Sequence, residues 1–264
     1  MMTVTAAHWL RLSLAGLLAL QLATSSEAVE RVPRPSESGF AQVDGISLFY
    51  QIYGSGEPIL LIHGGLSDGE VWRRQLAALS ENHRVIVADS RGQGRSTRDE
   101  TPITYDLMAD DYLALLDQLG ESSVALVGWS DGGIIGLDIA IRHPERLTRM
   151  FIQAANVTPD GALAHDPTKD VPELKHYESI SEEIEALWAN EPNFTREQLS
   201  SIPVPTEIAI GEHDETISRD HTLFIANTIP GARFVLLPQV GHSAPVEDPK
   251  GYAQAVLRFI DGTG

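Results

Sequence analysis

The chain has 264 residues, of which 42% are hydrophobic, which suits one α/β domain with a full apolar core. Charged residues make up only 21% of the sequence, so its composition does not indicate extensive disorder. The formal net charge of −18 repels phosphate backbones and argues against nucleic acid as a partner; a surface this acidic mainly favours solubility.

The first 28 residues resemble a secretory signal peptide. A weakly basic start precedes the apolar run 12–22, and residues 26–28, Ser-Glu-Ala, match a small-x-small cleavage site. The run is shorter than the roughly 20 residues of a membrane-spanning helix, although an uncleaved anchor is an open alternative. We expect a secreted or periplasmic protein that begins near Val29, without stable membrane insertion once the signal is removed. The chain has no cysteine, which excludes disulfides.

A flexible lead-in is predicted over residues 29–38, and a regular succession of strands and helices follows it. Alternating or fully apolar segments predict strands over residues 46–53, 58–62, 84–88, 124–127, 147–154, 207–210 and 234–237. Helical spacing predicts helices over residues 71–79, 107–119, 134–141 and 252–260. This alternation predicts an α/β fold over residues 39–264, with a mostly parallel sheet and helices on both of its faces.

One interval, from about residue 156 to residue 203, breaks this rhythm. It is rich in glutamate and contains a helical patch over residues 180–188. Because a structureless connection of this length is uncommon in a compact domain, we expect a small helical cap that covers the carboxyl edge of the sheet.

The most informative motif is G-x-S-x-G over residues 128–132, between a predicted strand and a predicted helix. This context is typical of a sharp turn that exposes the hydroxyl of its serine, here Ser130, and the glycines allow the turn to form. A serine hydroxyl becomes an effective nucleophile only with a base in hydrogen-bond reach. That base is usually a histidine oriented by a carboxylate.

Two later loops supply candidates for the base and the acid. Asp214 follows the short apolar strand 207–210, and His242 follows the next strand and is preceded by a glycine. The order serine, acid, histidine is the one expected in this topology, and parallel strands deliver all three residues to one edge. Glu212 and Glu215 are alternatives to Asp214 as the acid.

An acyl-transfer site also needs donors for the developing oxyanion. The backbone N–H of Asp131, which follows the serine, is one candidate. The second is expected from the segment His63-Gly64-Gly65-Leu66, with Gly65 as the first choice and Leu66 as the alternative. We expect the His63 imidazole to brace this loop rather than to take part in the chemistry.

Together these motifs resemble the α/β-hydrolase superfamily over residues 40–260. The matching segments are His63-Gly64-Gly65, the run 89–96, the serine motif, the stretch from Gly211 to Asp214, and Gly241-His242. The resemblance implies the fold, an acyl-enzyme mechanism and no requirement for a metal or an organic cofactor. It implies a structural role for the run 89–96. Ser130 stands where haloalkane dehalogenases and epoxide hydrolases need aspartate, which argues against both activities.

The motif Gly-Trp-Ser-Asp-Gly-Gly is similar to that of valacyclovir hydrolase-like enzymes, in which the acid after the nucleophile helps to bind a substrate ammonium group. The Asp131 side chain has a second interpretation, because a carboxylate in the first turn of a helix stabilises it by about 0.3–1 kcal/mol. Leu66, Trp129 and Trp188 are the candidates for substrate contact, with Trp188 expected to face the cleft from the cap.

We therefore expect a hydrolase that cleaves a small-molecule carboxylic ester or lactone. Four alternatives share these residues: a cofactor-free haloperoxidase or perhydrolase, a meta-cleavage C–C hydrolase, an amino-acid ester hydrolase, and a non-catalytic ligand-binding homologue. The identity of the substrate depends on how the cap folds over the site.

Overall fold

The computed structural model describes residues 32–163 and 178–263. The predicted signal peptide over residues 1–28 lies outside the described residues, as does part of the predicted cap. Within the described ranges, no helix is both long enough and apolar enough to cross a membrane.

The described chain is built on an eight-stranded sheet with the order β1-β2-β4-β3-β5-β6-β7-β8. β1 and β2 form an antiparallel hairpin, β2 pairs antiparallel with β4, and all the remaining neighbours are parallel. The strands are β1 (Glu37–Val43), β2 (Ile46–Gly54), β3 (Glu57–Ile62), β4 (His83–Ala88), β5 (Val124–Trp129), β6 (Leu147–Gln153), β7 (Thr206–Gly211) and β8 (Arg233–Leu237). This is the mostly parallel sheet that the sequence predicts.

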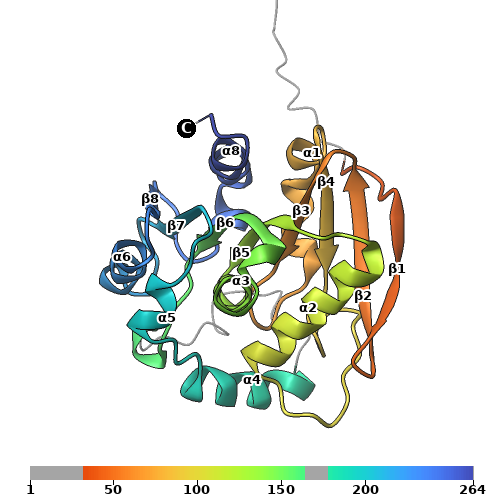
Figure 1. Ribbon diagram of the computed structural model, residues 1–264, viewed down its shortest axis with the longest axis horizontal. Helices are drawn as coiled ribbons and strands as arrows, with labels where there is room; N and C mark the ends of the chain where they lie inside the picture. Colours follow the sequence, from red (N-terminus) through yellow and green to blue (C-terminus); the bar gives the residue numbers. More distant parts are fainter. Residues whose placement is uncertain (1–31, 164–177, 264) are drawn as a thin grey trace, which may run out of the picture. The chain divides into compact units, whose positions relative to one another are not determined.

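The central strand β5 shows why these residues form a parallel sheet. Every residue from Val124 to Trp129 is buried, as expected for a strand covered by helices on both faces. The helices are α1 (Leu76–Leu79), α2 (Tyr105–Leu119), α3 (Asp131–Arg142), α4 (Glu178–Asn190), α5 (Arg196–Ser200), α6 (Arg219–Thr228), α7 (Ala244–Glu247) and α8 (Pro249–Ile260). Helices α2, α3 and α6 cover one face, and α1 and α8 cover the other (Figure 1).

Two segments differ from the sequence-based expectation. Strand β1 begins at Glu37, inside the predicted lead-in, because its backbone pairs with β2 along its whole length. The single helix expected over residues 71–79 is instead a 3-10 helix, Gly69–Arg74, followed by the short helix α1.

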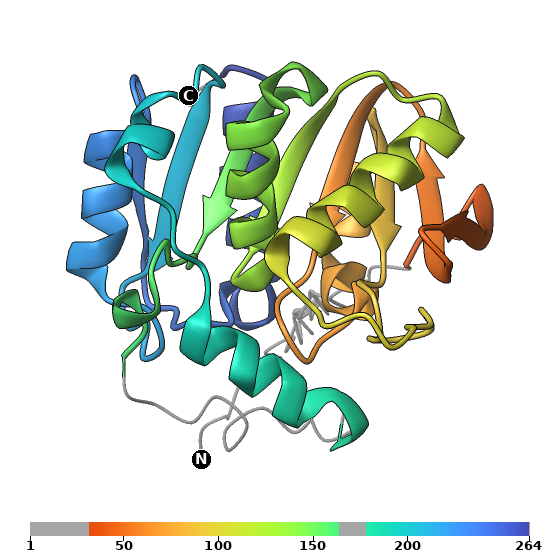
Figure 2. The same ribbon diagram turned by 60° about the horizontal axis from the view of Figure 1, so that its bottom comes forward.

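The described part of the predicted cap contains α4 and α5. Figure 2 shows α4 crossing beyond the carboxyl ends of the parallel strands. Ile180, Ile184 and Leu187 of α4 are buried, and they follow the helical spacing of an apolar stripe. Burial of each contributes about 1.5–3 kcal/mol. Glu183 of α4 also forms an ion pair with Arg98, in the loop after β4.

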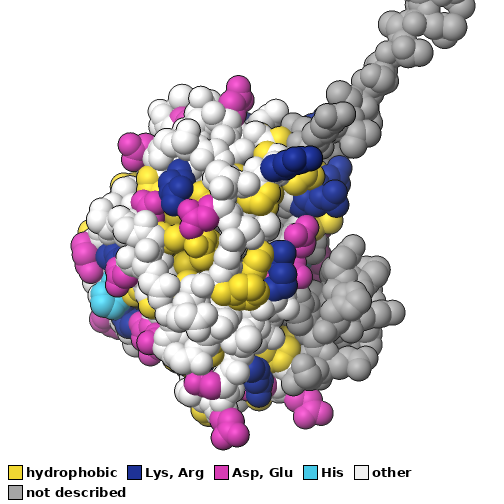
Figure 3. Space-filling model, turned by 90° about the vertical axis from the view of Figure 1, so that its right-hand side faces the viewer, with side chains coloured by type: hydrophobic (Ala, Val, Ile, Leu, Met, Phe, Trp, Pro, Cys, Tyr) yellow, Lys and Arg dark blue, Asp and Glu magenta, His cyan; other side chains and the backbone are white. Residues whose placement is uncertain are grey.

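The surface is acidic overall but mixed in detail. On the face shown in Figure 3, acidic and basic side chains are interspersed. Phe40 of β1 is among the most exposed large apolar side chains of the described residues, at 54%. Interspersed charges of this kind favour solubility.

Candidate active site

The G-x-S-x-G motif forms the turn between β5 and α3. Ser130 has φ 54° and ψ −120°, a region that side-chain-bearing residues rarely adopt. Hydrogen bonds at both ends hold the residue in this conformation. The Ser130 N–H donates to the Gln153 carbonyl at 2.9 Å, and the Ser130 carbonyl accepts from Gly133 N–H at 2.8 Å.

Both glycines of the motif are required by close approach of the backbone. A Cβ at Gly128 would overlap the Gly132 carbonyl oxygen, and a Cβ at Gly132 would overlap the Ile62 carbonyl oxygen. The turn therefore packs directly against the end of β3, which is the strand that leads into the predicted oxyanion loop.

Ser130, His242 and Asp214 form a hydrogen-bonded chain across the carboxyl edge of the sheet. The His242 Nε2 atom lies 3.1 Å from Ser130 Oγ, and Nδ1 lies 3.2 Å from Asp214 Oδ1. The carboxylate accepts the proton of Nδ1, which leaves Nε2 free to accept the hydroxyl proton of Ser130. The structure thus brings together the three residues that the sequence proposes, within hydrogen-bond distance of one another.

The Asp214 carboxylate is itself held by its own loop. Its side chain is 1% exposed, and Oδ1 accepts from Thr216 N–H at 2.9 Å and Ile217 N–H at 2.8 Å. These bonds offset the cost of burying the charge and fix the oxygen that faces His242.

Hydrogen bonds hold the backbone of the His242 loop through both its carbonyl and its N–H groups. The His242 carbonyl accepts from Trp129 Nε1 at 2.9 Å and from Gln153 Nε2 at 3.2 Å. The His242 N–H donates to Glu215 Oε2 at 3.1 Å, and the preceding Gly241 N–H donates to Glu247 Oε2 at 2.7 Å. These four groups set the position from which the imidazole reaches Ser130.

These contacts change the interpretation of three predicted residues. Glu215, an alternative to Asp214 as the acid, binds the backbone of His242 rather than its ring. Glu212, the other alternative, accepts from Gln239 N–H. Trp129, proposed for substrate contact, is buried beneath the histidine, with its ring 5.8 Å from the imidazole. The sequence carries no local signal for the support by Glu215 and Glu247.

The segment 63–66 passes close to the turn, as an oxyanion loop must. A Cβ at Gly64 would lie 3.2 Å from Ser130 Cβ, and a Cβ at Gly65 would overlap the Asp131 carboxylate. Leu66 has φ 52° and is 1% exposed, so its side chain belongs to the core rather than to an open pocket.

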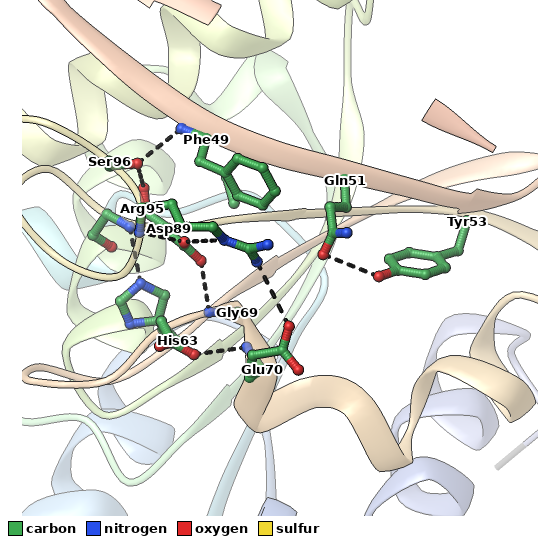
Figure 4. A network of polar contacts seen from close by, with 12 residues as sticks. Phe49, Gln51, Tyr53, His63, Gly69, Glu70, Asp89, Arg95 and Ser96 are labelled. Atoms are coloured by element: carbon green, nitrogen blue, oxygen red, sulfur yellow. Dashed lines mark hydrogen bonds and ion pairs between the residues drawn. The ribbon is translucent and has the colours of Figure 1, made fainter. Parts of the chain in front are cut away.

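His63 connects this loop to the loop after β4. Its Nδ1 lies 2.7 Å from the Gly64 carbonyl, and its Nε2 accepts from Ser90 N–H at 2.9 Å. Figure 4 shows His63 beside the polar network around Asp89. Only the neutral ring with its proton on Nδ1 can make both bonds. Burial lowers the pKa of His63 and so favours this form. The neighbouring Asp89 accepts from Gly69 N–H at 2.9 Å and from Arg95 N–H at 2.8 Å.

The Asp131 side chain lies between the predicted oxyanion loop, residues 63–66, and α4 of the cap. It accepts from Tyr105 Oη at 3.0 Å and from Trp188 Nε1 at 2.9 and 3.0 Å. The pKa of Asp131 is raised to about 6, chiefly because burial disfavours the charged form. Trp188 therefore reaches the site from α4, and its indole N–H is bound to this carboxylate.

Comparison with known proteins agrees with this architecture. Residues 57–178 match the family described as alpha/beta hydrolase fold. The chain is 31% identical to serine hydrolase BPHL of Mus musculus, over 97% of each chain. It is 28% identical to the putative carbamate hydrolase RutD of Azorhizobium caulinodans, over 83% of this chain and 97% of that protein. The solved structure of Est816, described as an N-acyl homoserine lactone degrading enzyme, is 26% identical. It superposes with a TM-score of 0.73, over 84% of this chain and all of that one.

An eight-stranded sheet of this order, with a serine turn after β5, defines a hydrolase scaffold whose reacting groups meet at the carboxyl edge. The chain belongs to the α/β-hydrolase family, and the relatives named above support a hydrolase activity.

Proposed function

We propose that the protein is a serine hydrolase that cleaves small carboxylic esters or lactones through an acyl-enzyme. The observation that carries this proposal is the chain from Asp214 through His242 to Ser130, with contacts of 3.2 and 3.1 Å. A histidine bound on one side by a buried carboxylate and on the other by a hydroxyl is the arrangement that activates serine.

The proposed reaction has two stages. His242 Nε2 takes the Ser130 proton as Oγ attacks the carbonyl carbon, and Asp214 stabilises the imidazolium that forms. The N–H groups of Gly65 and Asp131 are the proposed donors to the oxyanion. His242 then protonates the leaving alkoxide, and the acyl group remains on Ser130. Water, deprotonated by His242, attacks the acyl-enzyme and releases the acid.

The choice of esters and lactones rests on the site and on similarity. The site presents a serine nucleophile with a histidine base beside it, which suits an activated carbonyl with an alkoxide leaving group. The relative Est816 is described as acting on an N-acyl homoserine lactone, and BPHL is described as a serine hydrolase. An internal ester and an open ester present the same carbonyl to Ser130.

The proposal includes export of the protein, which rests on the signal-like residues 1–28 alone. N-terminal sequencing of the protein recovered from the periplasm or medium should begin near Val29. Recovery of a chain that begins at Met1 would contradict cleavage of the signal.

The activity is tested with a panel of p-nitrophenyl esters and lactones on the purified protein. We expect turnover of at least one class and its loss in Ser130→Ala. Near-normal turnover by Ser130→Ala would refute the proposal. Halide oxidation dependent on acetate and peroxide, with negligible ester turnover, would instead favour the haloperoxidase alternative.

A further inference from the structure

The carboxylate of Asp131 is occupied by hydrogen bonds from two other elements. Oδ1 accepts from Tyr105 Oη of α2 and from Trp188 Nε1 of α4, and Oδ2 shares the Trp188 donor. Asp131 is only 5% exposed. A carboxylate has about four lone-pair positions, and two protein donors make three contacts with them, because the Trp188 N–H is shared between both oxygens.

The remaining side of this carboxylate is covered by the oxyanion loop. A Cβ at Gly65 would overlap Asp131 Oδ2 and would lie 2.7 Å from Trp188 Cζ2. Even a methyl group does not fit between these atoms, so an ammonium group cannot enter there without separating α4 from the loop. The arrangement of Asp131 therefore differs from that of an open receptor for a cation.

We propose that Asp131 is a positioning residue that fastens the cap to the active site, and that the site accepts esters whose acyl group carries no ammonium. We call Asp131, Tyr105 and Trp188 the cap clamp. In the clamp the Trp188 indole N–H binds α4 to Asp131 in the first turn of α3. The Trp188 ring packs beside Gly65. This inference rests on the proposed function, since it concerns the acyl side of the same site.

Titration of the Asp131 carboxylate allows the cap clamp to be followed by a measurement that does not depend on catalysis. Asp131 accepts from both donors. His242, from the loop after β8, acts on the charge of Asp131, and Glu191 acts on Tyr105. Burial raises the pKa of Asp131, whereas the Trp188 and Tyr105 hydrogen bonds and His242 lower it. Protonation near pH 6 should therefore change the fluorescence of Trp188, because the indole loses a charged acceptor.

The first experiment compares two esters of one alcohol, L-valine and 3-methylbutanoate, which differ only by the amino group. The wild-type protein should hydrolyse the uncharged ester at least as efficiently as the valine ester near neutral pH. In Asp131→Asn, kcat/KM should fall for both esters by the same factor, so their ratio should change by less than about twofold. An ammonium receptor would instead lose about 10–100-fold with the valine ester alone, and that result would overturn the proposal.

The second experiment measures tryptophan fluorescence as a function of pH in the protein without substrate. A transition near pH 6 should disappear in Asp131→Asn and Trp188→Phe. In Tyr105→Phe it should move to higher pH, because one donor to the carboxylate is lost. Tyr252→Phe is the matched control, since the hydroxyl of this buried tyrosine has no hydrogen-bond partner among the described residues, and it should leave the transition unchanged.

A transition that is lost in Trp188→Phe but persists in Asp131→Asn, or that Tyr105→Phe does not move, would overturn the clamp. These readouts do not depend on turnover. A protein without esterase activity but with the expected titration would refute the proposed function and support the clamp. A protein with esterase activity but without the expected titration would support the proposed function and refute the clamp.

Discussion

The strain at Ser130 predicts that glycine at this position stabilises the fold while it abolishes the reaction. The residue has φ 54° and ψ −120°, held by the backbone bonds to Gln153 and Gly133. A side-chain-bearing residue in such a region costs about 1–3 kcal/mol, whereas glycine adopts it freely. Glycine also loses about 0.5–1 kcal/mol more than alanine through the entropy of the unfolded chain. The net expectation is that Ser130→Gly is more stable than Ser130→Ala by about 1 kcal/mol.

The comparison of these two variants isolates the strain, because both lack the hydroxyl that contacts His242. Urea unfolding at one pH gives the two free energies of unfolding, and the melting temperatures should differ by about 2–4 °C. Ser201, an exposed residue with φ −86° and ψ −9°, provides the control pair. There glycine should be less stable than alanine. If Ser130→Gly were equal to Ser130→Ala, or less stable, the conformational argument would be refuted.

Three further predictions follow from the site. Glu215→Gln and Glu247→Gln should each lower kcat by roughly 3–10-fold with little change in KM, because they weaken the bonds that position His242; steady-state kinetics measures this. Asp131 has a folded pKa of about 6, above the ordinary 3.8, so its contribution to the stability of the wild-type protein falls as pH rises between these values. Asp131→Asn should therefore gain stability relative to wild type by up to about 3 kcal/mol between pH ~4 and pH ~8, measured by urea unfolding; a pH-independent difference would contradict this. Gly65→Ala should abolish turnover in the ester assay, since its methyl group would overlap Asp131 and approach Trp188; normal kcat would refute the close packing.

The central sheet was predictable because buried parallel strands leave continuous apolar runs in the sequence. Strand β1 was not, since an exposed edge strand containing Glu37 and Ser38 has no such run, and its pairing with β2 decides its structure. Helix α6 (Arg219–Thr228) was also missed. It is polar over much of its length, although Ser218 caps its N-terminus.

The candidate nucleophile, base and acid were accessible from the sequence because each follows a recognisable strand in a fixed order. Their supports were not accessible. Trp188 is 57 residues from Asp131, and Glu215 is 27 residues from His242, so only the folded chain brings the pairs together. The contact of Trp129 with His242, 113 residues away, was hidden from the sequence for the same reason.

The most direct test of the account is covalent labelling of the purified protein with a fluorophosphonate probe, followed by peptide mass mapping. We predict one adduct, on Ser130, which is absent in Ser130→Ala and strongly slowed in His242→Ala. Ester turnover should fall in parallel by several orders of magnitude, up to about 10⁶-fold. A protein that hydrolyses esters while Ser130 stays unlabelled, or that reacts at another residue, would contradict the central claim.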